Sequence, residues 1–202
     1  MITRSGRPAA QRDEELLQLL ELFRADGVRS YLEIGARFGD TFDQVMRSLP
    51  ARSRGVAIDW PEGPWGVSGS EGHLVAAIHE LGHLGYDVQL IVGKSQASTT
   101  LAAATNLGPF DAILIDADHR YEAVRADWER YRPLGRMIAF HDIVGEGQRS
   151  GQGDLVEVPR LWAEIKAAES EVRELVAPDS RMGLGVVWPA PRLRGPSTVP
   201  KL

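Results

Sequence analysis

Short apolar runs alternate with amphipathic segments along most of this chain. The runs have the length of buried strands, and they lie at Tyr31–Ile34, Arg54–Ile58, Asp87–Val92, Phe110–Ile115 and Met137–Phe140. Apolar residues recur at helical spacing in the segments between them: Asp40–Leu49, His73–Leu81, Ala97–Asn106 and Tyr121–Tyr131. Strands that alternate with helices at this period predict an α/β fold, with a mostly parallel sheet and helices on both faces.

Both ends of the chain extend this pattern. Glu14–Asp26 has an apolar helical face and stops at Gly27; that face can pack on the sheet or on a second copy, which leaves a homo-oligomer open. After the fifth strand we expect a Gly-rich loop, a helix and two closing strands, at Gly145–Asp154, Val158–Ala168, Glu171–Val176 and Leu184–Trp188. The prediction is one domain over residues 1–188, with a flexible lead-in at 1–10 and a Pro-rich tail at 189–202.

Composition narrows the class of partner. The chain has 202 residues and a net charge of −5, without a long basic run, which argues against nucleic acid and favours a small-molecule partner. It has no cysteine, so disulfides and thiolate metal sites are excluded. Neither a signal peptide nor an apolar stretch of about 18 residues is present, so we expect a cytoplasmic protein that is not inserted in a membrane.

The first strand ends in a glycine turn with an acid just ahead of it. Glu33 is followed by Gly35 and Gly39, a G-x-x-x-G spacing, before the next helix begins. Glycine permits a sharp turn and a close approach to a ligand, and a helix start adds unpaired amide donors. The spacing differs from the G-x-G-x-x-G of dinucleotide-binding folds. It resembles the E/D-x-G-x-x-x-G of class I S-adenosylmethionine-dependent methyltransferases, in which the turn holds the amino-acid end of the cofactor.

Acids stand at the carboxyl ends of four predicted strands: Glu33, Asp59, Asp116 and Asp142. In a parallel sheet such ends meet at one edge, which is where ligands bind. Asp59 lies 20 residues after Gly39, about where a βαβ nucleotide-binding unit places the acid that binds ribose hydroxyls. The irregular stretch Trp60–Gly72, rich in proline, tryptophan and glycine, is too long for a simple connector, and we interpret it as an active-site loop.

A second motif points to different chemistry. The segment His79-Glu80-Leu81-Gly82-His83 matches H-E-x-x-H, in which two histidines one helical turn apart bind zinc. A zinc peptidase needs a continuous helix and a third ligand, but we expect Gly82 and Gly85 to end the helix here. The next glutamate is Glu122, beyond a strand, a helix and a strand. A zinc peptidase is therefore disfavoured.

The triplet Gly93-Lys94-Ser95 matches only the end of a Walker A loop. The full motif requires glycine at position 88, which is Val88 inside a predicted strand. We instead expect Gly93 and Ser95, which follow the third strand, to meet the adenine edge of a nucleotide.

The most specific resemblance lies in Phe110–Trp128 and Phe140–Ile143. These segments contain I-D-x-D-H-x-Y-E-x-V-x-x-D and, one strand later, H-D. They resemble a family of small bacterial O-methyltransferases related to those of cephalosporin biosynthesis and sugar O-methylation. The resemblance covers about residues 28–143 and implies a Rossmann-like, doubly wound sheet of seven strands, mostly parallel, with the last strand antiparallel.

The resemblance also implies how S-adenosylmethionine is bound. Glu33, Gly35 and Gly39 would hold the methionine end, Asp59 the ribose, and Gly93 and Ser95 the adenine side, with Asp116 as a further cofactor-binding residue. The chain departs from the family pattern at two places. Lys94 stands where an acid is common, and Leu134-Gly135-Arg136 replaces the usual Pro-Gly-Gly turn.

Methyl transfer requires that an acceptor oxygen be aligned with the activated methyl group and lose its proton. One interpretation places Mg²⁺ or another divalent cation on Asp116, His141 and Asp142, with Asp118 as a further candidate, because these strand ends resemble the magnesium site of catechol-type O-methyltransferases. The other is metal-free, with His119 as general base oriented by Asp116 or Asp142 and with His141 nearby.

The sequence therefore predicts an S-adenosylmethionine-dependent methyltransferase that acts on a hydroxyl of a small molecule or sugar. A non-catalytic module that binds the cofactor or assists assembly is the alternative. The acceptor is not predicted, because its pocket would be built from the least patterned parts of the chain.

Overall fold

The computed structural model describes residues 12–63, 66–67, 69–145, 147–149, 153 and 155–190. Strands and helices alternate along them, in the order α1 Asp13–Ala25, β1 Ser30–Ile34, α2 Asp40–Ser48, β2 Arg54–Asp59, α3 Ser70–His83, β3 Asp87–Val92, α4 Ser98–Leu107, β4 Phe110–Ile115, α5 Tyr121–Tyr131, the 3₁₀ turn η1 Arg132–Leu134, β5 Gly135–His141, α6 Val158–Ala168, β6 Val172–Leu175 and β7 Leu184–Val187. The predicted lead-in at 1–10 and most of the predicted tail lie outside the described residues.

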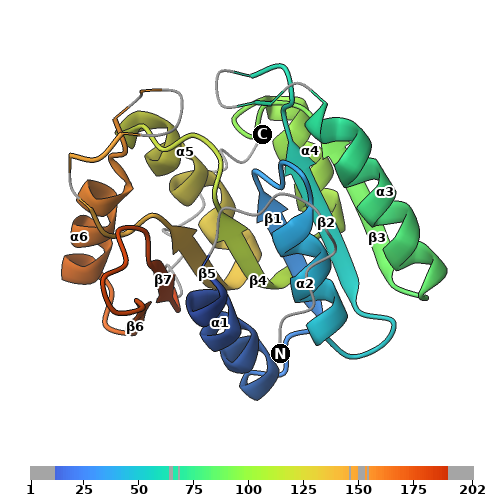
Figure 1. Ribbon diagram of the computed structural model, residues 1–202, viewed down its shortest axis with the longest axis horizontal. Coiled ribbons are helices and arrows are strands. Elements are labelled where there is room, and N and C mark those ends of the chain that lie inside the picture. Colours follow the sequence, from blue (N-terminus) through green and yellow to red (C-terminus); the bar gives the residue numbers. More distant parts are fainter. Residues whose placement is uncertain are drawn as a thin grey trace, which may run out of the picture.

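The strands form one sheet of seven, in the order β3-β2-β1-β4-β5-β7-β6 (Figure 1). The pairs from β3 to β5 are all parallel, whereas β7 runs antiparallel to both β5 and β6. The chain order reverses between β1 and β4, so the sheet is doubly wound about that point. The predicted Rossmann-like fold is thereby confirmed, including its antiparallel last strand.

Helices cover both faces of the sheet because its central strands are apolar on both sides. In β1, Tyr31 belongs to a core shared with α1, α2 and α3, while Leu32 belongs to a second core shared with α4, α5 and α6. The apolar face of α1 is buried in the first core, through Leu16, Leu19, Leu20 and Phe23. That face packs on the sheet, so it no longer argues for an oligomer.

The sheet register brings the predicted site residues together. Ile34 of β1 pairs with Ile58 of β2 and with Ile115 of β4, and Ile115 pairs with Phe140 of β5. The residues that follow these four therefore emerge side by side at the carboxyl edge of the sheet: Gly35, Asp59, Asp116 and His141.

Both ends of α3 differ from those predicted by two residues or more. α3 begins at Ser70, inside the expected loop Trp60–Gly72, and it continues through Gly82 to His83. The expectation that the helix ends before the second histidine is therefore wrong. No atom lies within 4 Å of the position that a Cβ would occupy at Gly82, and the helix continues through this residue. The turn that ends the helix instead uses Gly85, whose φ is +87°.

β5 is also longer than predicted and runs from Gly135 to His141. At its carboxyl end, Leu184 of the antiparallel strand β7 pairs with His141. None of the helices in the described part of the chain combines the length and apolar character that crossing a bilayer requires.

Candidate active site

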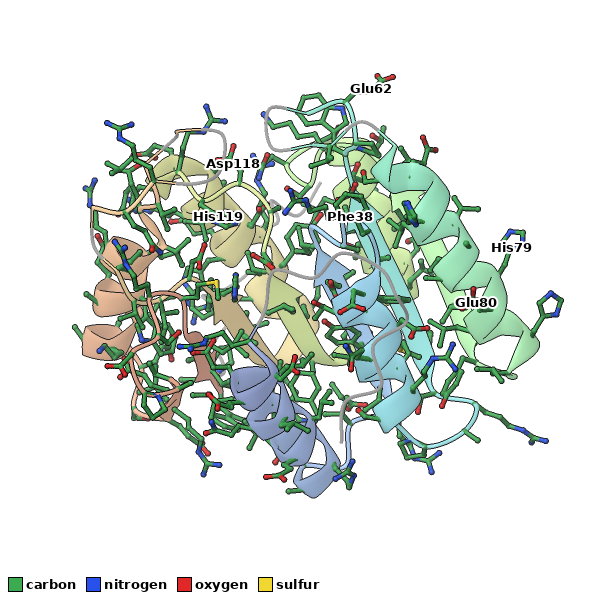
Figure 2. All side chains as sticks on the ribbon, viewed as in Figure 1. Phe38, Glu62, His79, Glu80, Asp118 and His119 are labelled. Carbon is green, nitrogen blue, oxygen red and sulfur yellow. The ribbon has the colours of Figure 1, made fainter. Side chains whose placement is uncertain are left out.

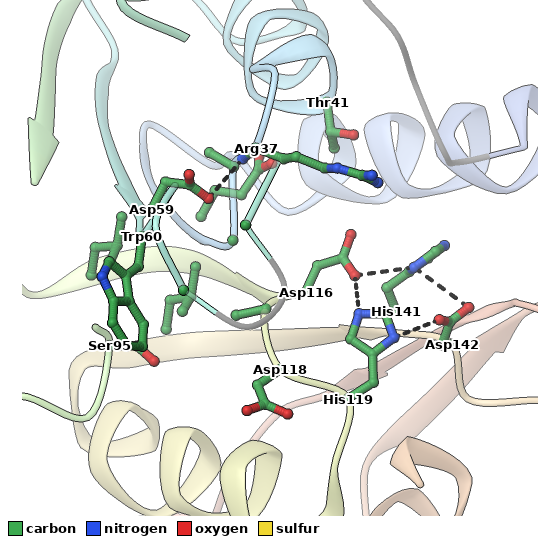
Figure 3. Close-up of a pocket in the computed structure, with 18 of the residues that line it drawn as sticks. Arg37, Thr41, Asp59, Trp60, Ser95, Asp116, Asp118, His119, His141 and Asp142 are labelled. Atoms are coloured by element: carbon green, nitrogen blue, oxygen red, sulfur yellow. Dashed lines mark hydrogen bonds and ion pairs between the residues drawn. The ribbon is translucent and has the colours of Figure 1, made fainter. Parts of the chain in front are cut away.

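A cavity of about 700 Å³ opens at the carboxyl edge of the sheet (Figure 3). Its volume lies in the range of small-molecule binding sites. The residues predicted to bind the cofactor or the divalent cation, or to act as general base, line it with the exception of Gly39: Glu33, Gly35, Asp59, Gly93, Ser95, Asp116, Asp118, His119, His141 and Asp142. Gly39 lies at the N-terminal cap of α2.

The glycine turn is as tight as its sequence predicts. Gly35 has a φ of +94°, and a Cβ there would lie 2.1 Å from the carbonyl oxygen of Asp116. Gly39 has a φ of +78°, and its Cβ would lie 3.0 Å from a methyl of Leu74. Glycine at position 35 therefore lets the turn lie directly against the end of β4, which brings Glu33 and Asp116 to the same part of the cavity.

Glu33 is a buried acid in an electronegative setting. It is 2% exposed, and the Tyr31 hydroxyl donates to its Oε2 over 2.6 Å. Burial raises the pKa of Glu33 to about 8. The hydrogen bond from Tyr31 opposes this rise, whereas the charges of Asp116, Asp59 and Asp40 add to it. A positively charged ligand group in this part of the cavity would be favoured, because it would offset those acids.

Asp59 is held by the turn opposite it. The backbone N–H of Arg37 donates to Asp59 Oδ1 over 2.9 Å. Burial raises the pKa of Asp59, and this hydrogen bond opposes the rise. Trp60, which is 40% exposed, follows it on the same side of the cavity (Figure 3). The acid and the indole together can bind a hydroxylated ring such as a ribose and stack on a flat base.

Two histidines and two aspartates form a cluster on the other side of the cavity (Figure 3). His119 Nδ1 lies 2.8 Å from Asp142 Oδ2, and His119 Nε2 lies 3.3 Å from Asp116 Oδ1. His141 Nδ1 lies 3.1 Å from the same Asp116 oxygen and 3.6 Å from Asp142 Oδ1. His119 thus bridges the two carboxylates through both of its ring nitrogens.

The cluster fixes the charges of its members. Burial alone would lower the pKa of His119, but its contacts with Asp116 and Asp142 raise it to about 10. Burial would likewise lower the pKa of His141, but the charge of Asp116 outweighs burial and the pKa is raised. Burial would raise the pKa of Asp116, yet the two imidazoles hold it well below its usual value. In this arrangement His119 is an imidazolium at neutral pH.

The predicted metal ligands do not fit a bound divalent cation. The carboxylates of Asp116 and Asp142 face imidazole nitrogens, and the raised pKa values of both histidines favour protonated rings, which have no lone pair for a metal. Within the described ranges, no group of three or more His, Asp or Glu side chains is placed to hold an ion. The prediction of magnesium on Asp116, His141 and Asp142 is therefore not supported.

The loop predicted to meet the adenine is held by residues that the sequence patterns did not indicate. Ser95 is 7% exposed, and its carbonyl accepts a hydrogen bond of 2.8 Å from the Tyr131 hydroxyl. Next to it, Gln96 Nε2 donates to Asp127 Oδ1 over 2.7 Å. Asp127 and Tyr131 are four residues apart in α5, so one buried helix face holds this loop. An acid on an otherwise apolar helical face was the signal available in the sequence.

Four other residues named in the sequence analysis lie outside the histidine–aspartate cluster. Asp118 pairs with Arg120, and Lys94 is exposed at the cavity wall. His79 and His83 of the H-E-x-x-H motif are both exposed on α3, and His79 lies on its outer side, far from His119 (Figure 2). The two histidines do not reach the cavity.

Comparison with solved structures shows shared folds at low sequence identity. An O-methyltransferase from Bacillus cereus in complex with SAH matches with a TM-score of 0.64 and 22% identity, over 90% of this chain and 84% of that one. The O-methyltransferase TomG from Streptomyces achromogenes, involved in tomaymycin synthesis and in complex with SAM, matches with a TM-score of 0.64 and 22% identity, over 89% of this chain and 81% of that one. Cofactor-bound Rv0187 from MTB matches with a TM-score of 0.68 and 22% identity, over 91% of this chain and 83% of that one.

Comparison by sequence gives the family. No curated protein matches the chain. A family model described as a methyltransferase domain matches residues 32–143, which contain the glycine turn, Asp59 and the whole histidine–aspartate cluster. The match covers more than half of the chain and agrees with the fold and with the predicted resemblance. The chain therefore belongs to the methyltransferase-domain family.

Proposed function

We propose that this protein transfers the methyl group of S-adenosylmethionine to a hydroxyl of a small molecule or sugar. The observation that carries the proposal is the division of one cavity into two halves. Glu33, Gly35 and Asp59 form an acid-rich cradle, and the cluster around His119 lies across from it. The first half suits a cationic nucleoside, and the second can take a proton.

The charge of S-adenosylmethionine suits the cradle. Its sulfonium and ammonium groups are both positive, and they would offset the acids that raise the pKa of Glu33. In this proposal Glu33, Gly35 and Asp116 bind the methionine end, and Asp59 binds the ribose hydroxyls. Gly39, which does not line the cavity, shapes the turn at the start of α2. The backbone at Gly93 and the Ser95–Gln96 loop form the adenine side.

His119 is the proposed general base. In the present geometry Asp116 and Asp142 keep it protonated. The positive charge of S-adenosylmethionine next to Asp116 would compete for that carboxylate, so the pKa of His119 would fall toward neutrality on binding. Neutral His119 then takes the acceptor's proton while the acceptor oxygen bonds to the methyl carbon and the carbon–sulfur bond breaks, leaving S-adenosylhomocysteine.

The other members of the cluster orient the base. Asp142 faces Nδ1 of His119, and Asp116 is shared between His119 and His141. His141 is only 4% exposed, so it acts through Asp116 rather than on the acceptor. Because His119 takes the proton of the acceptor directly, no step in this proposal requires a metal.

A methyl-transfer assay tests the proposal. Methyl-labelled S-adenosylmethionine is incubated with the protein and a panel of phenols, catechols and sugars. We expect transfer to at least one hydroxyl, and a decrease of about 10²-fold or more in His119→Ala, as is typical for loss of a general base. His79→Ala, which removes an exposed histidine on α3, is the matched control. Binding of S-adenosylmethionine without transfer to any acceptor would favour the non-catalytic module.

A further inference from the structure

Arg37 has a backbone conformation that arginine rarely adopts. It lies between Gly35 and Gly39 with a φ of +49°, in the left-handed region that glycine occupies without strain. Its backbone N–H, which binds Asp59, would be supplied equally well by glycine. The presence of a strained arginine at this position suggests that its side chain has a function.

The side chain extends into the half of the cavity that the cofactor proposal leaves for the acceptor. Arg37 lines the cavity, and Figure 3 shows its guanidinium on the same side as Asp116, His119 and Asp142, away from Trp60 and Ser95. The guanidinium carbon lies 5.4 Å from the centre of the neighbouring Phe38 ring. Arg37 thus presents a charge, and Phe38 an apolar ring, in the same cavity as the proposed base.

Arg37 also differs from several other arginines in its partners. Arg47, Arg120, Arg132 and Arg136 each form an ion pair with a carboxylate. Over the part of the chain that the structure describes, the guanidinium of Arg37 has no such pair, although acids surround the cavity. A guanidinium matches the planar, two-oxygen geometry of a carboxylate.

We propose that Arg37 binds a carboxylate of the methyl acceptor, so that the acceptor is a hydroxy acid whose ring or chain packs against Phe38. This inference rests on the proposed function and specifies its substrate class. A carboxylate at Arg37 fixes one end of the acceptor and leaves its hydroxyl free to meet His119. The methionine carboxylate of the cofactor is the other source of the same chemical group, and the experiment separates the two.

The test uses protein saturated with S-adenosylhomocysteine. A panel of hydroxybenzoic, hydroxycinnamic and sugar acids, each paired with its methyl ester, is titrated into this complex by calorimetry. We expect at least one acid to bind about tenfold or more tightly than its ester. Arg37→Gly, which relieves the backbone strain, should abolish that preference, and Arg37→Lys should retain part of it. Arg52→Gly is the matched control, because Arg52 has a φ of +64° but does not line the cavity.

Two outcomes would overturn the inference. In one, S-adenosylhomocysteine binds but no acid binds more tightly than its ester. In the other, Arg37→Gly weakens S-adenosylhomocysteine itself and leaves the preference for acids unchanged, which assigns the guanidinium to the methionine carboxylate. Failure of the proposed function looks different: either S-adenosylhomocysteine does not bind to the unmodified protein, or an acid binds with the expected preference but receives no methyl group from S-adenosylmethionine.

Discussion

Gln96 Nε2 donates a hydrogen bond of 2.7 Å to Asp127 Oδ1, which joins the loop after β3 to the buried face of α5. Asp127 is fully buried, and burial raises its pKa to about 6 despite the hydrogen bonds from Ser95 and Gln96. Tyr131, one turn further along α5, binds the carbonyl of Ser95. The proposed adenine side of the cavity is thus positioned by α5, which begins two residues after His119, the proposed base.

Asp127→Ala should weaken cofactor binding without direct contact to the cofactor. Removal of the carboxylate leaves Gln96 without this partner, so the loop loses its fixed position. We expect the affinity for S-adenosylhomocysteine to fall about tenfold, equivalent to about 1.4 kcal/mol. Calorimetry well below the melting temperature of the variant measures it. The control is Glu129→Ala on the exposed side of α5, and an unchanged dissociation constant in folded Asp127→Ala would refute the positioning role.

Cofactor binding should depend on the charge of Glu33. Its pKa of about 8 means that it is largely protonated at pH 7, whereas a cationic ligand favours the ionised form. Affinity should therefore increase from pH 6 to pH 8.5, and binding at pH 7 should release a proton. Calorimetry in two buffers with different ionisation enthalpies detects that proton. Glu33→Gln should reduce both effects and leave only the proton that His119 releases, and affinity independent of pH in the unmodified protein would contradict this account.

Ionisation of Glu33 should lower the stability of the folded protein, although it strengthens cofactor binding. The pKa of Glu33 in the folded protein, about 8, lies above its ordinary value of 4.5, so ionisation of Glu33 costs stability as the pH rises from about 4.5 through 8. Glu33→Gln should then be more stable than the unmodified protein at pH 8.5, by at least about 1 kcal/mol, since one pKa unit corresponds to about 1.4 kcal/mol. Urea unfolding at pH 4.5 and pH 8.5 measures the difference, which should be smaller at the lower pH.

Gly35→Ala should disrupt the turn. The new methyl would lie 2.1 Å from the Asp116 carbonyl oxygen, so the turn and the end of β4 must separate. We expect a loss of roughly 3 kcal/mol or more in the free energy of unfolding, together with loss of cofactor binding. Gly27→Ala is the control, because its φ of +67° imposes strain but no atom lies within 4 Å. It should cost only about 1–2 kcal/mol. Equal losses in both variants would show that the close approach to Asp116 carries no extra cost.

Removal of divalent ions should leave methyl transfer nearly unchanged. The carboxylates of Asp116 and Asp142 face His119 and His141, which neutralise them. Activity after dialysis against EDTA should remain within about twofold of the starting value, a change too small for loss of a metal that activates the acceptor. Activity that is lost on chelation and restored by Mg²⁺ would instead favour the metal-assisted mechanism.

Much of the fold follows from local sequence because a sheet covered on both faces requires continuous apolar strands. β3, β4 and α5 match their predicted ranges, and their alternation predicted the parallel order. The end of α3 did not follow, since Gly82 and Gly85 look alike in sequence and only the second adopts the left-handed conformation that ends the helix.

The site was predictable as a set of strand ends but not as a set of contacts. The four acids and two histidines could be placed at one edge from the alternation of elements alone. His119 bridges Asp116 and Asp142 and so acquires a pKa of about 10. This contact depends on side-chain directions at the ends of two strands, which the sequence pattern does not give. The position of Arg37 depends on a single backbone angle, which local sequence does not determine.

Binding of S-adenosylmethionine is the most direct test of the central claim. The purified protein is titrated with S-adenosylmethionine by calorimetry, beside Asp59→Ala and the control His79→Ala. We predict saturable binding at one site, weakened about tenfold or more by loss of the Asp59 carboxylate and unchanged in the control. Absence of binding, or binding that Asp59→Ala leaves intact, would contradict the assignment of this cavity to the methyl donor.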